Sequence, residues 1–356
     1  MSTWFKRLRV PLLVLLIVAT FPWWLASGQY AQSIATTALI WIAVGIAWNI
    51  LGGFGGQLSL GHALFFGEGA YGVYMLNHYW GISPWLGLLL VGFVGAISAL
   101  PFIIVFRLRG AYFSLATFAI VTVLLDLASS GNSITNGPDG LSLPLVNGGD
   151  APGSFQFANQ EVYFFIALAL AALAFAVSAW VAHSRLGLRL RAIRDDEGAA
   201  AASGIGVLGV KTVTFCLTAF MTAAAGAVYM QVVQFIDPPS AFGYTVITQS
   251  VINPMAGGLG TLWGPVLGGG ILYPLEQELS NIFPSLPSGA GLAIYGLVVM
   301  IIMRFEPGGL LALLSRLTRL IERPVRRQFR RREPAPALAA AAPDAEPERM
   351  PSGRDH

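Results

Sequence analysis

The chain has 356 residues, of which 55% are hydrophobic and only 11% are charged, and its mean hydropathy is +0.66. A soluble domain would have about a quarter of its residues charged, so the composition excludes an ordinary soluble protein and predicts a polytopic membrane protein. The net charge of +3 does not indicate nucleic-acid binding, because the basic residues lie at the edges of apolar segments. Cys216 is the sole cysteine, which excludes an intrachain disulfide and a cysteine-based metal site.

Apolar segments of about twenty residues, the length that crosses a bilayer, recur along most of the chain. They predict an all-α membrane protein with about ten transmembrane helices. The first follows Lys6, Arg7 and Arg9, a start that resembles a signal peptide, but the later spans favour an uncleaved helix. The predicted spans lie near residues 11–27, 31–51, 58–79, 85–106, 110–128, 161–183, 211–233, 243–257, 264–281 and 290–304.

Lysine and arginine side chains mark the cytoplasmic side of membrane proteins. If the N-terminus is in the cytosol and the number of spans is even, all basic segments fall on that side, including Arg107, Arg109 and Arg304. We therefore predict that both termini are cytoplasmic. The resulting parts are an N-terminal segment with the first helix (1–30), a transmembrane domain (31–304) with a cytoplasmic loop (184–211) and an external loop (129–160), a basic segment on anionic lipid (305–332) and a disordered tail (333–356).

The cytoplasmic loop contains the pattern of a short helix. Three acidic residues, 195–197, complement the positive end of a helix dipole, and the alanines that follow have the best helix propensity. Gly204 then ends the helix. One side of this helix, at Ala199, has almost no side-chain bulk, so another protein could approach its backbone closely. The helix is therefore either a docking element or a solvated connection.

Residues 52–72 are rich in glycine. Gly67 to Gly72 formally match the G-x-G-x-x-G dinucleotide fingerprint, but that motif requires a preceding β-strand and a later acidic residue, and here the flanks are apolar spans. Ser59, Ala63 and Gly67 instead recur at a spacing of four, which lets membrane helices approach closely. The glycines between residues 52 and 56 break the helical backbone, which is tolerated near a membrane only inside protein or a water-filled cavity. We expect this segment inside the bundle.

Glu68 lies inside a predicted span, where an ionisable side chain is costly and usually functional. Three interpretations remain: it lines a translocation path, it is neutralised by protonation, or it is the partner of a buried donor. His62 is interpreted as a packing residue, because no second histidine lies at the spacing of a metal site, and no metal site is predicted. Asp126, Asp237 and Glu276 lie near the outer ends of spans and are expected to be solvated caps.

The chain lacks the sequence motifs of nucleotide binding and of hydrolases. It contains no G-x-x-x-x-G-K-[ST] sequence, and its only lysines are Lys6 and Lys211, so it cannot hold ATP phosphates in a P-loop. The motifs H-E-x-x-H and G-x-S-x-G are absent too. We predict that the protein is not an enzyme and that its energy comes from elsewhere.

Four motifs, in order along the chain, resemble one group of transporters. GQLSLGHALFFGEGAY (56–71), RLRGAYFS (107–114) and GGLGTLWGPVLG (257–268) are similar to motifs of the branched-chain amino-acid ABC transporter permeases. RDDEGAA (194–200) with Gly204 resembles the coupling loop of ABC importer permeases. The resemblance is to LivM-like members and covers most of residues 31–304. Glu68 departs from it, because that position is normally apolar in the family.

The resemblance implies an ABC importer permease fold in the bacterial cytoplasmic (inner) membrane. The implied cargo is leucine, isoleucine and valine or, in related members, urea, short amides or other amino acids. The implied partners are a second permease chain, two cytosolic ATPase subunits that bind ATP and magnesium, and an extracytoplasmic binding protein. This chain would itself bind no cofactor and no nucleic acid. A proton-coupled secondary transporter that uses Glu68 and Asp126 is the alternative from another class.

The resemblance and the residue patterns described above assign candidate residues to three roles. The contact with the ATPase would be formed by Arg194, Asp195, Asp196, Glu197, Ala199, Ala200 and Gly204. The translocation pathway would include Gln57, Ser59, His62 and Glu68. Close helix packing and broken helices are expected at Gly55, Gly56, Gly61, Gly67, Gly257, Gly258, Gly260 and Gly264.

Overall fold

The computed structural model describes residues 18, 20, 28–108, 110–131, 135–144, 146–282, 290–306 and 308–316. Most of the predicted first span, most of the basic segment and the whole predicted tail lie outside the described residues. The chain separates into two units, Met1–Leu313 and Leu314–His356. The helices described below belong to the first unit.

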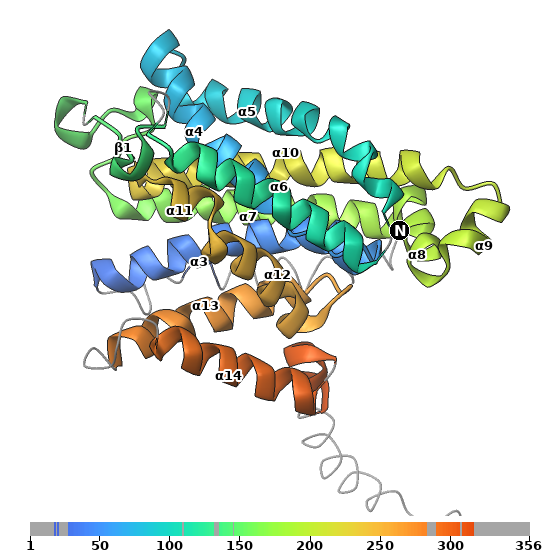
Figure 1. Ribbon diagram of the computed structural model, residues 1–356. Helices are drawn as coiled ribbons and strands as arrows, with labels where there is room; N and C mark the ends of the chain where they lie inside the picture. Colours follow the sequence, from blue (N-terminus) through green and yellow to red (C-terminus); the bar gives the residue numbers. More distant parts are fainter. Residues whose placement is uncertain are drawn as a thin grey trace, which may run out of the picture. The chain divides into compact units, whose positions relative to one another are not determined.

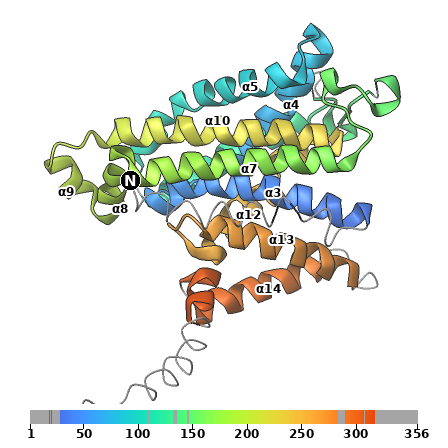
Figure 2. The same cartoon turned by 180° about the vertical axis from the view of Figure 1, so that it is seen from behind.

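Helix α3 (Gln29–Asn49) is the centre of the fold. Every residue from Thr36 to Asn49 is buried, as expected for a helix that is apolar on all sides. It lies beside α7 (Gln160–His183) and also contacts α10 (Val207–Val233), α12 (Tyr244–Gly258) and α13 (Gly264–Ile282) (Figure 1, Figure 2). At its end the chain continues without a break into one π-helical segment, η1 (Ile50–Phe54). Elements far apart in sequence therefore meet on α3.

Helices α4 (His62–Trp80) and α10 touch through their backbones. A Cβ atom on Gly69 would lie 1.9 Å from the Ala223 carbonyl oxygen, and one on Gly226 would lie 2.0 Å from the Phe66 carbonyl oxygen. Small residues permit such approach between membrane helices. These two glycines lie outside the predicted repeat of Ser59, Ala63 and Gly67.

Two members of that repeat lie elsewhere. Ser59 precedes α4, and Gly67 faces the Phe242 ring of α11 (Pro238–Phe242), where an added Cβ would lie 2.1 Å from the nearest ring carbon. Gly67 is thus a close-packing position, with α11 as its neighbour, and the sequence spacing does not tell which neighbour each face of α4 meets.

The remaining elements cover this core. Helix α5 (Pro84–Ser98) packs on α4 and α10, and it is followed by two short 3₁₀ turns and by α6 (Ala111–Ser129). Residues 141–142 (β1) pair antiparallel with residues 235–236 (β2), which is a small exception to the predicted all-α fold. The other helices are α8 (Arg185–Asp195), α9 (Glu197–Ala202) and α14 (Ala290–Phe305).

The predicted spans from residue 31 onward are present as helices, but only some qualify as spans by length and composition. Within the described residues five helices are long and apolar enough to cross a membrane, or six if the bent pair at 293–305 and 309–316 forms one span. The five are Gln29–Phe54, Pro84–Ile103, Ala111–Ser129, Gln160–His183 and Val207–Val233. Helices α4, α12, α13 and α14 are shorter or contain more glycine and polar residues. The chain is thus a multi-pass helical membrane protein, and ten spans remain a prediction.

The two polar ends of the bundle differ in charge. Helices α8 and α9 lie at one end, and the segment that contains β1 lies at the opposite end (Figure 1, Figure 2). Helix α8 contains four arginines, and the last turn of α14, which contains Arg304, is at the same end (Figure 1). The basic loop and the predicted external loop therefore lie at opposite ends, as the charge pattern requires.

Candidate functional site: the α8–α9 loop and its seat

The predicted short helix is present as α9, with a cap at each end. The Asp196 carboxylate accepts a hydrogen bond from the Ala199 backbone N–H at 2.8 Å, which satisfies an otherwise unpaired donor at the helix start. Gly204 follows the helix with φ of +83°, a left-handed conformation that glycine adopts at low cost. The boundaries of α9 are thus set by these two residues.

One face of α9 is exposed and nearly without side-chain bulk. Ala199, Ala201, Ala202 and Ser203 are exposed, and Gly204 has open space where a side chain would lie. Ala200 is instead only 4% exposed and packs in an apolar cluster with residues of η1, α8 and α10. Ala200 therefore anchors α9 to the protein, whereas its neighbours form a surface that another backbone can approach.

Glu197 is held by an ion pair to α10. Its carboxylate lies 2.9 Å from the Lys211 ammonium, and the exposed fractions of the two side chains are 29% for Glu197 and 1% for Lys211. A buried charge without a partner is strongly destabilising, so Lys211 requires Glu197. Sequence analysis missed Lys211 as a member of this site. The sequence feature that could have indicated it is that Lys211, one of only two lysines, lies at the start of an apolar span.

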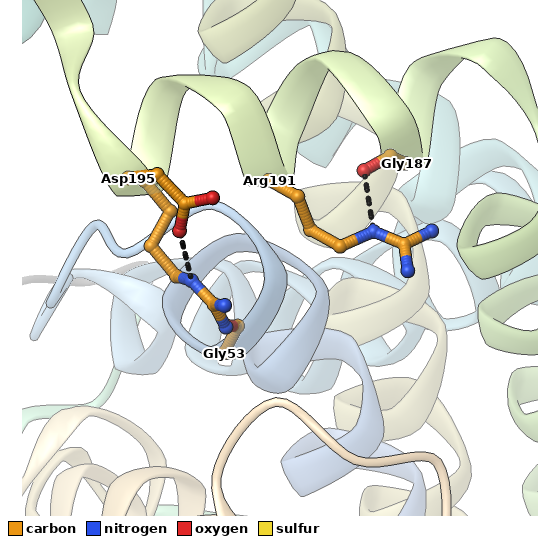
Figure 3. Close-up of polar contacts among 5 residues, drawn as sticks. Gly53, Gly187, Arg191 and Asp195 are labelled. Carbon is orange, nitrogen blue, oxygen red and sulfur yellow. Dashed lines mark hydrogen bonds and ion pairs between the residues drawn. The ribbon is translucent and has the colours of Figure 1, made fainter. Parts of the chain in front are cut away.

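The other charged residues of α8 are all exposed, but some of them also contact backbone groups of the bundle. Asp195 is 74% exposed, while Arg194 is 43% exposed and donates from Nη1 to the Gly53 carbonyl oxygen of η1 at 3.0 Å. Arg191 folds back on its own helix and donates from Nε to the Gly187 carbonyl at 3.2 Å (Figure 3). Arg194 therefore points toward the helix bundle.

The glycine-rich turn between α12 and α13 is tightly closed. A Cβ on Gly257 would lie 1.8 Å from the Gly264 carbonyl oxygen, and one on Gly264 would lie 2.1 Å from the Gly258 carbonyl oxygen. Gly260, with φ of +72°, lies against Gly53. On the glycine-rich segment between η1 and α4, a Cβ on Gly55 would lie 2.8 Å from the Leu51 carbonyl oxygen of η1. A Cβ on Gly61 would lie 3.3 Å from the Thr117 Cβ of α6. The α12–α13 turn therefore brings backbone segments into direct contact, whereas Gly61 packs against the Thr117 side chain of α6.

The residues expected along a translocation path are mostly enclosed. Ser59 and His62 are 0% exposed, and the His62 ring lies edge-on to Phe65 and Phe215. The Ser59 carbonyl accepts a hydrogen bond from the Trp48 indole at 2.6 Å. Gln57, the remaining uncharged candidate, is half-buried. In this conformation Ser59 and His62 are packing residues and line no opening.

The carboxylates of the spans have definite partners. Glu68 accepts a hydrogen bond from the half-buried Ser98 hydroxyl of α5 at 2.6 Å, so the carboxylate has a structural partner between α4 and α5. Asp237 caps α11, as expected. Glu276 was expected to be a solvated cap, but it is 8% exposed and accepts a hydrogen bond from the Gln249 amide of α12, so that expectation was wrong. Asp126 is exposed on α6.

Replacing Glu68 with glutamine tests the proton-carrier alternative. Glutamine keeps an oxygen that can accept the Ser98 hydroxyl, so we expect Glu68→Gln to transport like the unmodified protein. Ser98→Ala should reduce the free energy of unfolding by about 1.5–3 kcal/mol, because the carboxylate loses its donor. Substrate uptake into proteoliposomes and thermal unfolding in detergent measure the two effects. Loss of uptake in Glu68→Gln at normal stability would favour the proton carrier.

A cavity of about 440 Å³ lies beside α8. It is lined by Phe54, Ala182, His183, Leu188, Arg191, Gly260 and Leu262, which belong to η1, to α7 and α8, and to the turn before α13. Among the described residues, no group of three histidine, cysteine, aspartate or glutamate side chains could hold a metal ion. The site therefore consists of the exposed, low-bulk surface of α9, the Glu197–Lys211 ion pair, and the hydrogen bond from Arg194 to η1.

A bundle of apolar spans interrupted by one exposed, low-bulk helix on a basic loop is the arrangement of a multi-pass membrane protein with one polar connection at its end. The chain belongs to the family described as branched-chain amino acid transport system, permease component, whose model matches residues 30–303. The predicted resemblance is thereby confirmed. It is an ABC transporter permease family, so this chain is a multi-pass permease.

Several curated proteins are similar to the chain. The permease protein LivM of the high-affinity branched-chain amino acid transport system of Salmonella typhimurium is 27% identical over 323 residues, which cover 84% of this chain and 74% of LivM. The permease protein LivH of the corresponding Escherichia coli system is 28% identical over 70% of this chain and 83% of LivH. The nucleoside ABC transporter permease protein NupC of Lactococcus lactis is 25% identical over 71% of this chain and 82% of NupC. No solved structure matches the chain.

Proposed function

We propose that this chain is one permease subunit of an ABC importer for leucine, isoleucine and valine in a bacterial inner membrane. The family match over residues 30–303 carries the proposal, together with the greater similarity to LivM than to NupC in identity and coverage. The nucleoside permease makes nucleosides the second candidate cargo. In both cases a binding protein outside the membrane would select the cargo.

The chain needs partners to work in this way. It has no P-loop motif, so two separate ATPase subunits would supply the energy and bind ATP and magnesium. LivM and LivH are both named as permease proteins of high-affinity branched-chain amino acid transport systems, and both are similar to this chain. This supports a second, related permease chain as its partner across the translocation path.

The α8–α9 end would face the cytosol and receive the ATPase. Its arginines agree with a cytoplasmic location, and the exposed face of α9 offers little side-chain bulk against a partner. Closure of the ATPases would move α9 and, through its contacts with α8 and α10, the spans around α3. The exposed residues Asp195, Ala199 and Gly204 would meet the ATPase, whereas Ala200, Glu197 and Arg194 would hold the loop to the bundle.

Transport by reconstituted complexes tests the proposal. The chain is placed in proteoliposomes with a second permease chain, the ATPases and the binding protein encoded beside it, and uptake of labelled leucine and of labelled uridine is measured. We expect leucine uptake that requires ATP and all four partners. Uptake of uridine alone would support the nucleoside alternative. Accumulation by the chain alone on a proton gradient would contradict an ABC permease.

Substitution of Gly204 tests the role of α9. Gly204→Leu forces a side chain into a left-handed backbone conformation, at a cost of about 1–2 kcal/mol, and puts bulk next to the exposed face. We expect normal membrane insertion and ATP hydrolysis, but much less leucine uptake per ATP. Gly206→Leu is the matched control, because Gly206 also has open space but a φ of −71°. Equal coupling in the two variants would remove the role assigned to this end of α9.

A further inference from the structure

Arg194 lies in a space that the absence of side chains at Gly56 and Gly260 leaves open. Its Nη1 atom donates to the Gly53 carbonyl oxygen at 3.0 Å. A Cβ on Gly56 would lie 2.6 Å from the Arg194 Cγ, and a Cβ on Gly260 would lie 3.1 Å from Nη1. Figure 3 shows Gly53 next to the end of α8 that carries Asp195. The absence of side chains at these glycines thus permits the end of α8 to contact η1 and the α12–α13 turn together.

Asn49 joins the same two segments from inside the bundle. It is 0% exposed, its Oδ1 accepts from the Gly260 backbone N–H at 2.9 Å, and its Nδ2 donates to the Thr261 carbonyl oxygen at 2.9 Å. A Cβ on Gly53 would lie 2.0 Å from that Oδ1 atom. The hydrogen bonds of Arg194 and Asn49 therefore end on two adjoining segments, η1 at Gly53 and the α12–α13 turn at Gly260 and Thr261, whose backbones are in contact between them.

Segment η1 is suited to bending. Residues 50–54 form a π-helix, a wide turn that commonly occurs at functional positions and at helix kinks. The cavity of about 440 Å³ touches Phe54, Arg191 and Gly260. This space is partly open to the outside, so α8 and the turn are not closely packed against each other on that side.

We propose that Arg194 and Asn49 are positioning residues that transmit the movement of α9 to α3 and to the α12–α13 turn. This inference rests on the proposed function. The Arg194 side chain is 43% exposed and its Nε lies 3.7 Å from the Asp195 carboxylate, while its Nη1 donates into the bundle, so Arg194 joins the exposed end of α8 to η1. The α8–α9 loop would move α10 through the Glu197–Lys211 ion pair and the α3 end through Arg194, so that both sides of the bundle respond together.

Four variants of the reconstituted complex separate this role from simple stabilisation. Arg194→Met keeps the aliphatic stem beside Gly56 but removes the donor, and Arg194→Lys keeps a charged donor. Asn49→Leu has a similar volume but no hydrogen bonds. Arg189→Met is the control, because Arg189 is exposed on the same helix. Leucine uptake and ATP hydrolysis are measured on the same liposomes and expressed as uptake per ATP, which removes differences in the amount of folded complex.

We expect Arg194→Met and Asn49→Leu to reduce uptake per ATP by about two- to thirtyfold while hydrolysis continues, which is the range for substitutions that change coupling between sites. Arg194→Lys should recover much of the loss, and Arg189→Met should behave like the unmodified complex. The double variant Arg194→Met/Asn49→Leu should lose less than the product of the single losses, because both act on one connection.

Unchanged uptake per ATP in Arg194→Met would overturn the inference, even if less folded complex were recovered. Independent, multiplicative losses in the double variant would also contradict a single connection. Failure of the proposed function gives a different result, because the unmodified complex would then show no ATP-dependent leucine uptake at all.

Discussion

Gly226→Ala is expected to prevent stable folding of the protein. The added methyl carbon would lie 2.0 Å from the Phe66 carbonyl oxygen of α4, and a backbone atom cannot rotate away as a flexible side chain can. Overpacking usually costs about 1–3 kcal/mol, and a clash between two helix backbones should exceed that range. Because Gly69 makes the reciprocal contact with Ala223, Gly69→Ala should have the same effect.

A second glycine on α10 provides the control for this prediction. Gly209 is exposed and has open space where a side chain would lie, so Gly209→Ala should stabilise the helix by up to about 1 kcal/mol through better helix propensity. Monodispersity in detergent and the melting temperature measure both variants. If Gly226→Ala melted within about 2 °C of the unmodified protein, the close contact of α4 and α10 would be wrong.

Glu197→Gln is expected to destabilise the protein more than Lys211→Met does. In Glu197→Gln the ammonium of Lys211, whose side chain is 1% exposed, loses its counter-charge, and breaking a buried pair in this way costs about 3–5 kcal/mol. In Lys211→Met the remaining charge is that of Glu197, whose side chain is 29% exposed and can be hydrated by water. The unequal burial of the partners thus predicts the order of the two effects.

The double variant Glu197→Gln/Lys211→Met completes this test. It leaves no unpaired buried charge, so it should be more stable than Glu197→Gln alone, although α9 would lose its ionic attachment to α10. Thermal unfolding gives the stability, and uptake per ATP gives the coupling, which should be reduced in all three variants. Additive destabilisation by the two substitutions would show that the side chains do not depend on each other.

The helices that hold the bundle together were predictable from the sequence because their apolar runs are long. The predicted spans at 161–183 and 211–233 correspond to α7 (Gln160–His183) and α10 (Val207–Val233). The short helix α9 was equally predictable, since its acidic start, alanines and terminal glycine are local signals. Membrane class and family followed from composition and from motifs that remain close together in the chain.

The contacts between distant segments were not predictable in this way. The four-residue spacing of Ser59, Ala63 and Gly67 indicated close packing, and Gly67 does pack against Phe242, but the backbone contact of α4 with α10 is made by Gly69 and Gly226, which that spacing did not indicate. Lys211, the partner of Glu197, is fourteen residues away in the sequence. From the sequence alone it was interpreted as one more basic residue at the edge of a membrane span. Glu276 is buried because α12 supplies Gln249 beside it, which no local pattern indicates.

The most direct test of the account is a photo-crosslink from the exposed face of α9. A photoreactive benzoylphenylalanine is placed at Ala201, or at Asp150 in the loop at the opposite end of the bundle as control, and the assembled complex is irradiated in membranes. Both positions are exposed. We predict that Ala201 crosslinks to an ATPase subunit and that Asp150 does not. A crosslink from Asp150 to the ATPase, or none from Ala201, would contradict the assignment of α9 as the coupling helix.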